Sequence, residues 1–214
     1  MAQSVLERIY EEKIIAIVRG IPSGKIAALA QALAEGGVSC IEVTFDQTNP
    51  EETLTSLRTI KSELGDRICL GAGTVMTVEQ VEQAAQAGAE YMISPNVDEA
   101  VIRATKALGK VSIPGAMTPT EILAAHQAGA DLVKVFPVDR LGPSYLSAVL
   151  APLRHVRLLA VGGVDAGNIS DFLRAGALGV GVGGSLVNAG LVRDGELGEI
   201  TRRARAMTAA ARGA

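Results

Sequence analysis

The sequence lacks the features that mark membrane, secreted or nucleic-acid-binding proteins. No window approaches the roughly 18 uncharged apolar residues that span a bilayer, and no basic segment followed by an apolar one opens the chain. The formal net charge is −3 and like charges form no run, so the sequence shows no basic segment that would bind nucleic acid or anionic lipid. We therefore expect a cytoplasmic protein whose partner is a small molecule.

Cysteine and aromatic residues are also scarce. Cys40 and Cys69 are the only cysteines, and each falls inside an apolar strand pattern, which is typical of small buried side chains in a reduced compartment. There is no tryptophan, and aromatic residues make up 3% of the chain. With 24 glycines and 48% hydrophobic residues, the composition favours packed α/β layers over disorder. We expect one domain over residues 1–214.

Short apolar runs alternate with helical periodicity along the whole chain. A helix is expected in the first dozen residues, before the first run, and Ser23 and Thr118 are expected to cap later helices. The last helix is expected from about residue 196. The runs cover residues 14–18, 40–45, 68–70, 91–95, 111–115, 132–137, 158–161 and 179–182. Eight such units predict the α/β class, as a single-domain (β/α)8 TIM barrel with an extra N-terminal helix.

An internal repeat supports this division. Four helix ends carry glycine just before a strand, and each glycine is a candidate left-handed cap. They read Glu35-Gly36-Gly37-Val38, Ala87-Gly88-Ala89-Glu90, Ala128-Gly129-Ala130-Asp131 and Ala175-Gly176-Ala177-Leu178. An open doubly wound sheet is the less favoured alternative, because Arg19-Gly20-Ile21-Pro22 stands where a dinucleotide fingerprint would follow the first strand.

Two charged residues interrupt apolar strands. Lys134 lies in Leu132–Phe136, and Glu42 lies in the run that starts at Cys40. If these faces line the barrel, the two side chains share one apolar cavity, where burial lowers the pKa of a lysine and frees its amine to attack a ketone. A nearby carboxylate can move the protons. The structural alternative is an ion pair that bridges strands, which is costly to place in such surroundings.

Glycine-rich stretches follow the last two strands. Gly162-Gly163 comes after one and Gly183-Gly184-Ser185 after the other. In a TIM barrel these loops often bind phosphate through backbone N–H groups, and glycine lets the anion approach closely. A hydroxyl donor at Ser185 would add to the site. Tight turns alone are the alternative interpretation, but the position in both loops favours a phosphate site.

Other candidates stand at strand ends. Arg19 ends the first strand, where its guanidinium would bind a carboxylate; a surface arginine is the alternative. Thr74 and Pro95 occupy similar places, although turn chemistry alone explains them nearly as well. His126 and His155 have no partner at ligand spacing, so we expect no metal and no cofactor.

Several motifs occur together in order along the chain. They are Ile14-Ile15-Ala16-Ile17-Val18-Arg19-Gly20, Ile41-Glu42-Val43-Thr44, Gly71-Ala72-Gly73-Thr74-Val75, Ile93-Ser94-Pro95, Pro114-Gly115, Val133-Lys134-Val135-Phe136-Pro137, Gly162-Gly163 and Gly184-Ser185. From about residue 8 to 208, the chain resembles the 2-keto-3-deoxy-6-phosphogluconate and 4-hydroxy-2-oxoglutarate aldolases, with the phosphogalactonate branch included.

The resemblance implies a class I aldolase, a carbon–carbon lyase, that acts without a metal or other cofactor. Lys134 matches the Schiff-base lysine, and Glu42 matches the general acid/base that works through a water. Members of this family are typically homotrimers. The positions that match the pyruvate half are Thr74, Pro95 and Phe136, and those that match the phosphate end are Gly162, Gly163, Gly184 and Ser185; Gly183 is a candidate from its place in the loop.

Two positions depart from the common family pattern. Many members carry an arginine shortly after the Glu-Val-Thr motif to hold the pyruvyl carboxylate, whereas Phe45-Asp46-Gln47 follows here, and Arg19 is expected to take that role. Val161 stands where many members place threonine. Val161-Gly162-Gly163-Val164 and Leu141-Gly142-Pro143 are more similar to the phosphogalactonate branch.

The expected reaction, which is the type found in the Entner-Doudoroff route, is cleavage of a 2-keto-3-deoxy-6-phospho sugar acid of the gluconate type to pyruvate and glyceraldehyde 3-phosphate. 4-Hydroxy-2-oxoglutarate is a further candidate substrate, and the galactonate-configured acid is an alternative one. The same residues also fit a non-covalent phosphosugar isomerase or epimerase, or a non-catalytic phosphometabolite-binding protein. The sequence alone does not distinguish the sugar configurations.

Overall fold

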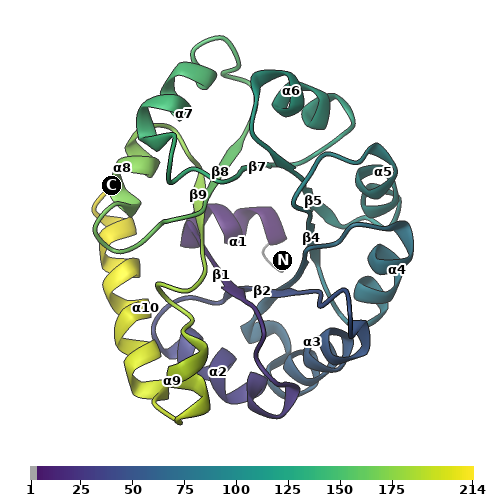
Figure 1. Ribbon diagram of the computed structural model, residues 1–214, viewed down its shortest axis with the longest axis vertical. Coiled ribbons are helices and arrows are strands. Elements are labelled where there is room, and N and C mark those ends of the chain that lie inside the picture. The colour runs from purple at the N-terminus through teal and green to yellow at the C-terminus, as the bar shows by residue number, and fades with distance from the viewer. Residues whose placement is uncertain (1–3) are drawn as a thin grey trace.

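A computed structural model describes residues 4–214 as a ring of parallel strands surrounded by helices (Figure 1). The sheet order is β5-β4-β3-β2-β1-β9-β8-β7-β6, and all paired neighbours run in parallel. The strands are β1 (Ile14–Val18), β2 (Cys40–Thr44), β3 (Cys69–Gly73), β4 (Tyr91–Ile93), β5 (Val111–Ile113), β6 (Gly115–Ala116), β7 (Val133–Val135), β8 (Leu158–Val161) and β9 (Gly179–Val182).

The two ends of this sheet are parts of one stretch. β5 and β6 are separated only by Pro114, which has no N–H group and cannot continue a ladder. Its carbonyl accepts a hydrogen bond from the Lys134 N–H at 2.9 Å. Because β5 pairs with β4 and β6 with β7, the stretch joins both ends of the sheet. The predicted (β/α)8 TIM barrel is confirmed, but the single strand expected over 111–115 is corrected to two short strands.

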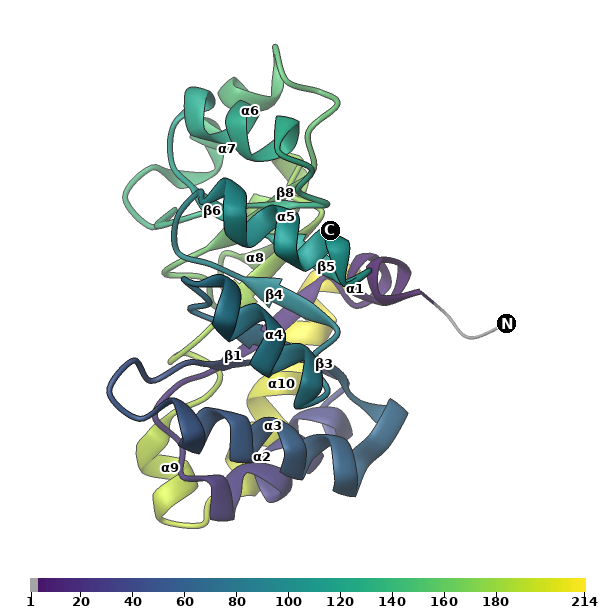
Figure 2. The same ribbon diagram turned by 90° about the vertical axis from the view of Figure 1, so that its right-hand side faces the viewer.

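The helices cover the outside of the ring, except α1, which lies across one end of it (Figure 1 and Figure 2). They are α1 (Val5–Glu12), α2 (Ser23–Glu35), α3 (Pro50–Leu64), α4 (Val78–Gln86), α5 (Glu99–Ala107), α6 (Pro119–Gln127), α7 (Gly142–Leu150), α8 (Ile169–Arg174), α9 (Ala189–Arg193) and α10 (Leu197–Arg212), with a 3-10 turn at Gly65–Arg67. The short α9 was not predicted. No helix within residues 4–214 has the length and apolar character needed to cross a bilayer.

The predicted helix caps are partly right. Thr118 caps α6, and Glu121 completes the capping box as predicted. Ser23 was expected to cap α2, and this was wrong: Pro22 occupies the cap position, and the Ser23 N–H donates to Glu52 at 2.6 Å. The glycines predicted as left-handed caps have positive φ angles of +87°, +102°, +105° and +106°, which confirms the repeat; they are Gly37, Gly88, Gly129 and Gly176.

Alternate residues of each strand face two separate cores, as expected when a parallel sheet is covered on both faces. On β2, Ile41 and Val43 pack under the helices, whereas Cys40 faces the barrel interior. On β7, Val133 and Val135 also face outward. The interior set is Ile9, Ile15, Cys40, Cys69, Tyr91, Ile93, Val111, Ile113, Leu132, Leu159 and Val161. The part of the barrel interior that adjoins α1 is therefore filled with side chains.

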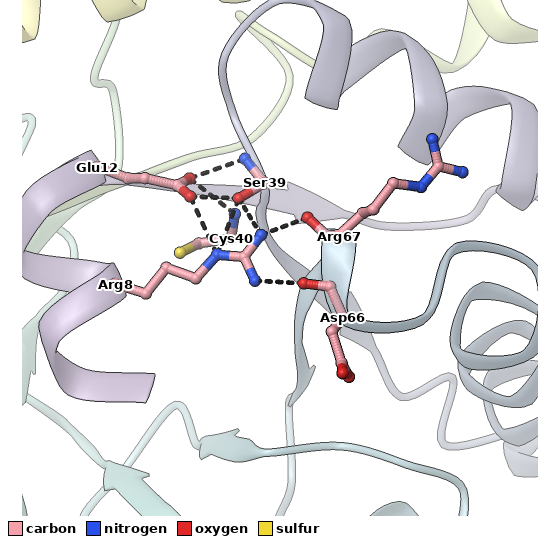
Figure 3. A network of polar contacts seen from close by, with 6 residues as sticks. All are labelled: Arg8, Glu12, Ser39, Cys40, Asp66 and Arg67. Carbon is pink, nitrogen blue, oxygen red and sulfur yellow. Dashed lines mark hydrogen bonds and ion pairs between the residues drawn. The ribbon is translucent and has the colours of Figure 1, made fainter. Parts of the chain in front are cut away.

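Helix α1 lies at the end of the barrel opposite the loops that follow the strands (Figure 2). Its Ile9 is fully buried in the interior core. Glu12 accepts hydrogen bonds from the N–H groups of Ser39 and Cys40 at 2.8 and 3.0 Å, and Arg8 donates to Ser39 Oγ and to the carbonyl of Asp66 (Figure 3). These bonds join the expected N-terminal helix to the start of β2 and to the turn before β3. Residues 1–3 lie outside the described chain.

We predict that Glu12→Ala lowers the free energy of unfolding by about 2 kcal/mol, because two partly buried N–H groups at the start of β2 lose their acceptor. Exposed Glu11→Ala is the matched control and should change the free energy of unfolding by less than about 0.5 kcal/mol. Urea unfolding of both variants measures this. Equal effects of the two substitutions would contradict the role given to Glu12.

Candidate active site

The two charged strand residues lie inside the barrel on opposite walls. Lys134 is 7% exposed and Glu42 is 2% exposed. Lys134 lies on β7 and Glu42 lies on β2. Going round the ring from β2 to β7, one path crosses β1, β9 and β8, and the other crosses β3, β4, β5 and β6. The sequence therefore predicted correctly that both side chains lie on interior faces of buried strands.

Glycines on β3 make room for the side chains of its neighbours. In register, Glu42 on β2 pairs with Gly71 on β3, and Gly71 pairs with Tyr91 on β4. A Cβ atom at Gly71 would lie 2.0 Å from the Tyr91 ring, and one at Gly73 would lie 1.6 Å from Glu42 Oε1. The Glu42 carboxylate therefore lies over Gly73, in space that any other residue there would fill.

Burial shifts the pKa values of both groups toward their neutral forms. Burial raises the pKa of the Glu42 carboxyl, and the positive charges of Lys134 and Arg19 counter part of that rise. Burial lowers the pKa of the Lys134 amine; the Glu42 charge opposes this shift and the Arg19 charge adds to it. The three groups thus belong to one electrostatic unit, in which burial shifts both the amine and the carboxyl toward the neutral form.

The lysine and the carboxylate are not a direct ion pair. Their nitrogen and oxygen atoms are not within 4.0 Å of each other. Within residues 4–214, the Tyr91 hydroxyl is the single fully enclosed side-chain polar atom without a hydrogen bond. The end groups of Lys134 and Glu42 are therefore not fully enclosed. Lys134 Nζ lies 4.8 Å from the centre of the Phe136 ring. The structural ion pair considered from the sequence is therefore not formed.

A cavity of about 460 Å³ opens at the barrel mouth. Its lining includes Arg19 and the two glycine-rich loops that the sequence singled out. Ile17 also lines it and was not among the predicted site residues, although it lies two residues before Arg19 and so shares its face of β1. The complete lining is Ile17, Arg19, Phe136, Val161, Gly162, Gly163, Val164, Asp165, Gly181, Gly183, Gly184 and Ser185. Arg19 is exposed and makes no ion pair or hydrogen bond to the described residues.

The glycine-rich loops present unused hydrogen-bond donors to this cavity. Asn168 donates to the Gly163 carbonyl at 2.9 Å, and Ser185 Oγ donates to the Val164 carbonyl at 2.7 Å. In the described chain, the N–H groups of Gly163, Gly184 and Ser185 make no hydrogen bond. With its hydroxyl proton already donated, Ser185 has its backbone N–H left for a ligand. Free N–H groups that line one cavity are suited to an anion.

The remaining predicted site residues lie at the ends of β3 and β4. Thr74 is half-buried and has a φ of +55°, a left-handed conformation that costs a β-branched residue about 1–2 kcal/mol. Pro95 is exposed, and its carbonyl lies 2.4 Å from where a Cβ of Gly115 would be. Asp46, which follows the Glu-Val-Thr motif, turns its carboxylate back to accept from Thr48.

The two histidines meet on the surface. The rings of His126 and His155 are in edge-to-face contact with centroids 5.1 Å apart, a contact between residues 29 positions apart in sequence that no local pattern predicts. Among residues 4–214, no group of three or more histidine, cysteine, aspartate or glutamate side chains is arranged to hold a metal ion.

Comparison with known proteins relates the whole chain to one family. Residues 5–203 match the family model for KDPG and KHG aldolase. A probable 2-dehydro-3-deoxy-6-phosphogalactonate aldolase of Rhizobium meliloti (strain 1021) is 39% identical, over 94% of this chain and 92% of that protein. A 2-dehydro-3-deoxy-phosphogluconate aldolase of Treponema pallidum (strain Nichols) is 34% identical, over 92% of this chain and 93% of that protein.

The fold leads to the same family. A solved structure described as native KDPGal is similar to this one with a TM-score of 0.85 and 34% sequence identity, over 94% of both chains. The family match therefore extends over the barrel that carries Lys134, Glu42 and the glycine-rich loops. The chain belongs to the KDPG and KHG aldolase family of carbon–carbon lyases.

Proposed function

We propose that this aldolase cleaves a 2-keto-3-deoxy-6-phospho sugar acid to pyruvate and glyceraldehyde 3-phosphate through an imine on Lys134. The observation that carries the proposal is the buried lysine, whose pKa is lowered by burial, opposite a buried carboxyl whose pKa is raised. An isolated lysine of ordinary pKa is almost fully protonated at neutral pH and attacks ketones slowly. Burial in the barrel increases the fraction of free amine.

In the first step, Lys134 Nζ attacks the C2 ketone of the substrate, and the carbinolamine loses water to form an iminium ion. The C3–C4 bond then breaks, its electron pair moves into the iminium group to give an enamine, and the C4 hydroxyl loses its proton as the aldehyde forms. Protonation of the enamine at C3 and hydrolysis release pyruvate and restore the free amine.

Glu42 is proposed to move the protons in these steps. Because burial raises the pKa of its carboxyl, the carboxylate is a stronger base than that of an exposed glutamate, which suits a group that must both give and accept protons. As an acid it assists the departure of water from the carbinolamine, and as a base it accepts the proton of the C4 hydroxyl. Glu42 lies over Gly73, across the barrel from Lys134, and the substrate and a bridging water are proposed to bind between the two groups.

Substrate binding is assigned to the cavity at the barrel mouth. Arg19 is proposed to bind the C1 carboxylate, because its guanidinium has no partner in the described chain and lines the same cavity. The phosphate group is proposed to bind to the free N–H groups of the two glycine-rich loops. Thr74, Pro95 and Phe136 are proposed to line the pyruvate half.

The configuration of the sugar acid at C4 has two candidates. The gluconate type was expected first from the sequence. The greater identity to a protein described as a phosphogalactonate aldolase, 39% against 34% for the phosphogluconate aldolase, favours the galactonate type as a second candidate. Comparing kcat/KM for the two acids, and for 4-hydroxy-2-oxoglutarate, distinguishes the candidates because pocket contacts decide such ratios.

We predict that borohydride reduction in the presence of pyruvate attaches a carboxyethyl group to Lys134, because the reagent reduces the imine to a stable amine. Peptide mass spectrometry locates the modified lysine. Lys134→Met should lose the modification and reduce pyruvate release by at least about 1000-fold, whereas the control Lys110→Met should retain both.

An unmodified Lys134 at saturating pyruvate would reject the imine mechanism. Turnover with no modification would instead favour the non-covalent isomerase or epimerase considered from the sequence. Ligand binding with no turnover would favour a phosphometabolite-binding protein.

We further propose that the whole chain works as one domain, in the cytoplasm, and assembles as a homotrimer. Support for assembly comes from large apolar side chains that remain exposed on the single chain. Met76 and Val78, near the start of α4, and Met117, before α6, are 40%, 39% and 39% exposed, and exposed apolar side chains mark association surfaces where they form one contiguous patch.

We predict that light scattering with size-exclusion chromatography gives three times the mass of one chain. A mass of one or two chains over the range of concentrations used in assays would contradict the homotrimer.

A further inference from the structure

A pair of glutamine side chains connects the loop after β2 with the turn after β3. Met76 N–H donates to Gln80 Oε1 at 2.7 Å, Gln80 Nε2 donates to Gln47 Oε1 at 2.7 Å, and Gln47 Nε2 donates to the Thr74 carbonyl at 2.9 Å. The three bonds form one chain that begins and ends on the same turn. Gln80 is buried and Gln47 is exposed.

The direction of every bond in this chain is fixed by its ends. A backbone N–H can only donate and a carbonyl can only accept, so each amide must present its oxygen toward Met76 and its nitrogen toward Thr74. If either amide were replaced by a carboxylate, two acceptors would face each other. The chain is therefore specific for amide side chains at both positions.

The turn held by these bonds is strained. Thr74 has a φ of +55°, and Lys13 is the one other non-glycine residue with positive φ between residues 4 and 214. Strain of this kind persists when the surrounding structure holds it, and it is concentrated at functional sites. Here the carbonyl of the strained residue and the N–H group two positions later are both bound by the glutamine chain.

The same turn adjoins the place where the Glu42 carboxylate lies. Gly73, over which Glu42 Oε1 lies, immediately precedes Thr74. A rotation of the backbone at Thr74 would move Gly73 and the space that holds the carboxylate. In the loop after β2, the Asp46 carboxylate accepts a hydrogen bond from Thr48 of the same loop. The side chain that this loop extends to the neighbouring turn is that of Gln47.

We propose that Gln47 and Gln80 are positioning residues, which act through Thr74 and Gly73 to hold the pyruvate half of the site and the Glu42 carboxylate in place. The proposal rests on the aldolase function proposed above. Neither glutamine touches the reacting atoms. Their effect should appear in turnover of bound substrate more than in recognition of the phosphate group, which the loops after β8 and β9 are proposed to bind.

The test uses the isosteric variants Gln47→Glu and Gln80→Glu, with the exposed Gln127→Glu as the control for added charge. Each single variant should lower kcat about tenfold and change KM less than threefold. The double variant should be no slower than the slower single variant, because either substitution alone already interrupts the run of hydrogen bonds. The control should match the unsubstituted protein. Additive effects, or kcat within twofold of the unsubstituted protein in both variants, would overturn the proposal.

Gln47→Met keeps the proposal testable if the charged variants fold poorly, because Gln47 is exposed and methionine has similar length. In this variant kcat should fall as in Gln47→Glu, because the bonds of Gln47 to Gln80 and to the Thr74 carbonyl are both lost; an unchanged kcat would overturn the proposal. Borohydride trapping separates the two proposals. Absence of trapping at Lys134 in the unsubstituted protein rejects the aldolase function, whereas normal trapping with unaffected glutamine variants rejects only the positioning role.

Discussion

The site depends on two ionisable groups that the barrel buries almost completely on opposite walls. Removing an amine and a carboxyl from water is unfavourable, and replacing such a pair by apolar residues is often neutral or stabilising. In this protein the two groups are not even in direct contact, so the cost of burial is not offset by a close ion pair. The shifted pKa values of Lys134 and Glu42 are the chemical result, and the lowered pKa of Lys134 increases the fraction of neutral amine for the proposed imine chemistry.

Other features of the barrel support this arrangement. Gly73 leaves the space that the Glu42 carboxylate fills, and Gly71 leaves the space that the Tyr91 ring fills. Between these residues and α1, the barrel interior is packed with apolar side chains. Helix α1 covers that end of the barrel through Ile9 and Glu12. Access to the two charged groups is therefore from the mouth, where the loops after the strands are free to bind a substrate.

Much of this organisation could be predicted from the sequence. The near-continuous apolar strands and the repeated helix-ending glycines predict the barrel, because both patterns are local. The lysine in the β7 strand and the glutamate in β2 predict the site, because a period of two assigns each side chain to a face. Glycine-rich loops after the last two strands indicated the lining of the cavity that the structure contains.

The features that escaped prediction depend on contacts between distant segments. The apolar pattern predicted one continuous strand over 111–115, but Pro114 divides it into β5 and β6, because proline lacks the N–H group that the hydrogen-bond ladder needs. The Gln47–Gln80 chain and the contact of His126 with His155 join residues whose separation in sequence follows no helical or strand period. The enclosed Tyr91 hydroxyl was likewise unexpected, since a tyrosine in an apolar strand ordinarily finds a partner.

The measurement that tests the central claim most directly is the titration of Lys134, followed by NMR of the ¹³C-labelled carbon next to its amine. The account predicts a midpoint below the ordinary value of 10.5. Glu42→Gln should lower the midpoint further, because it removes the negative charge that favours the ammonium form, and Arg19→Gln should raise it by removing a positive charge. A midpoint at or above 10.5 in the unsubstituted protein would contradict the account.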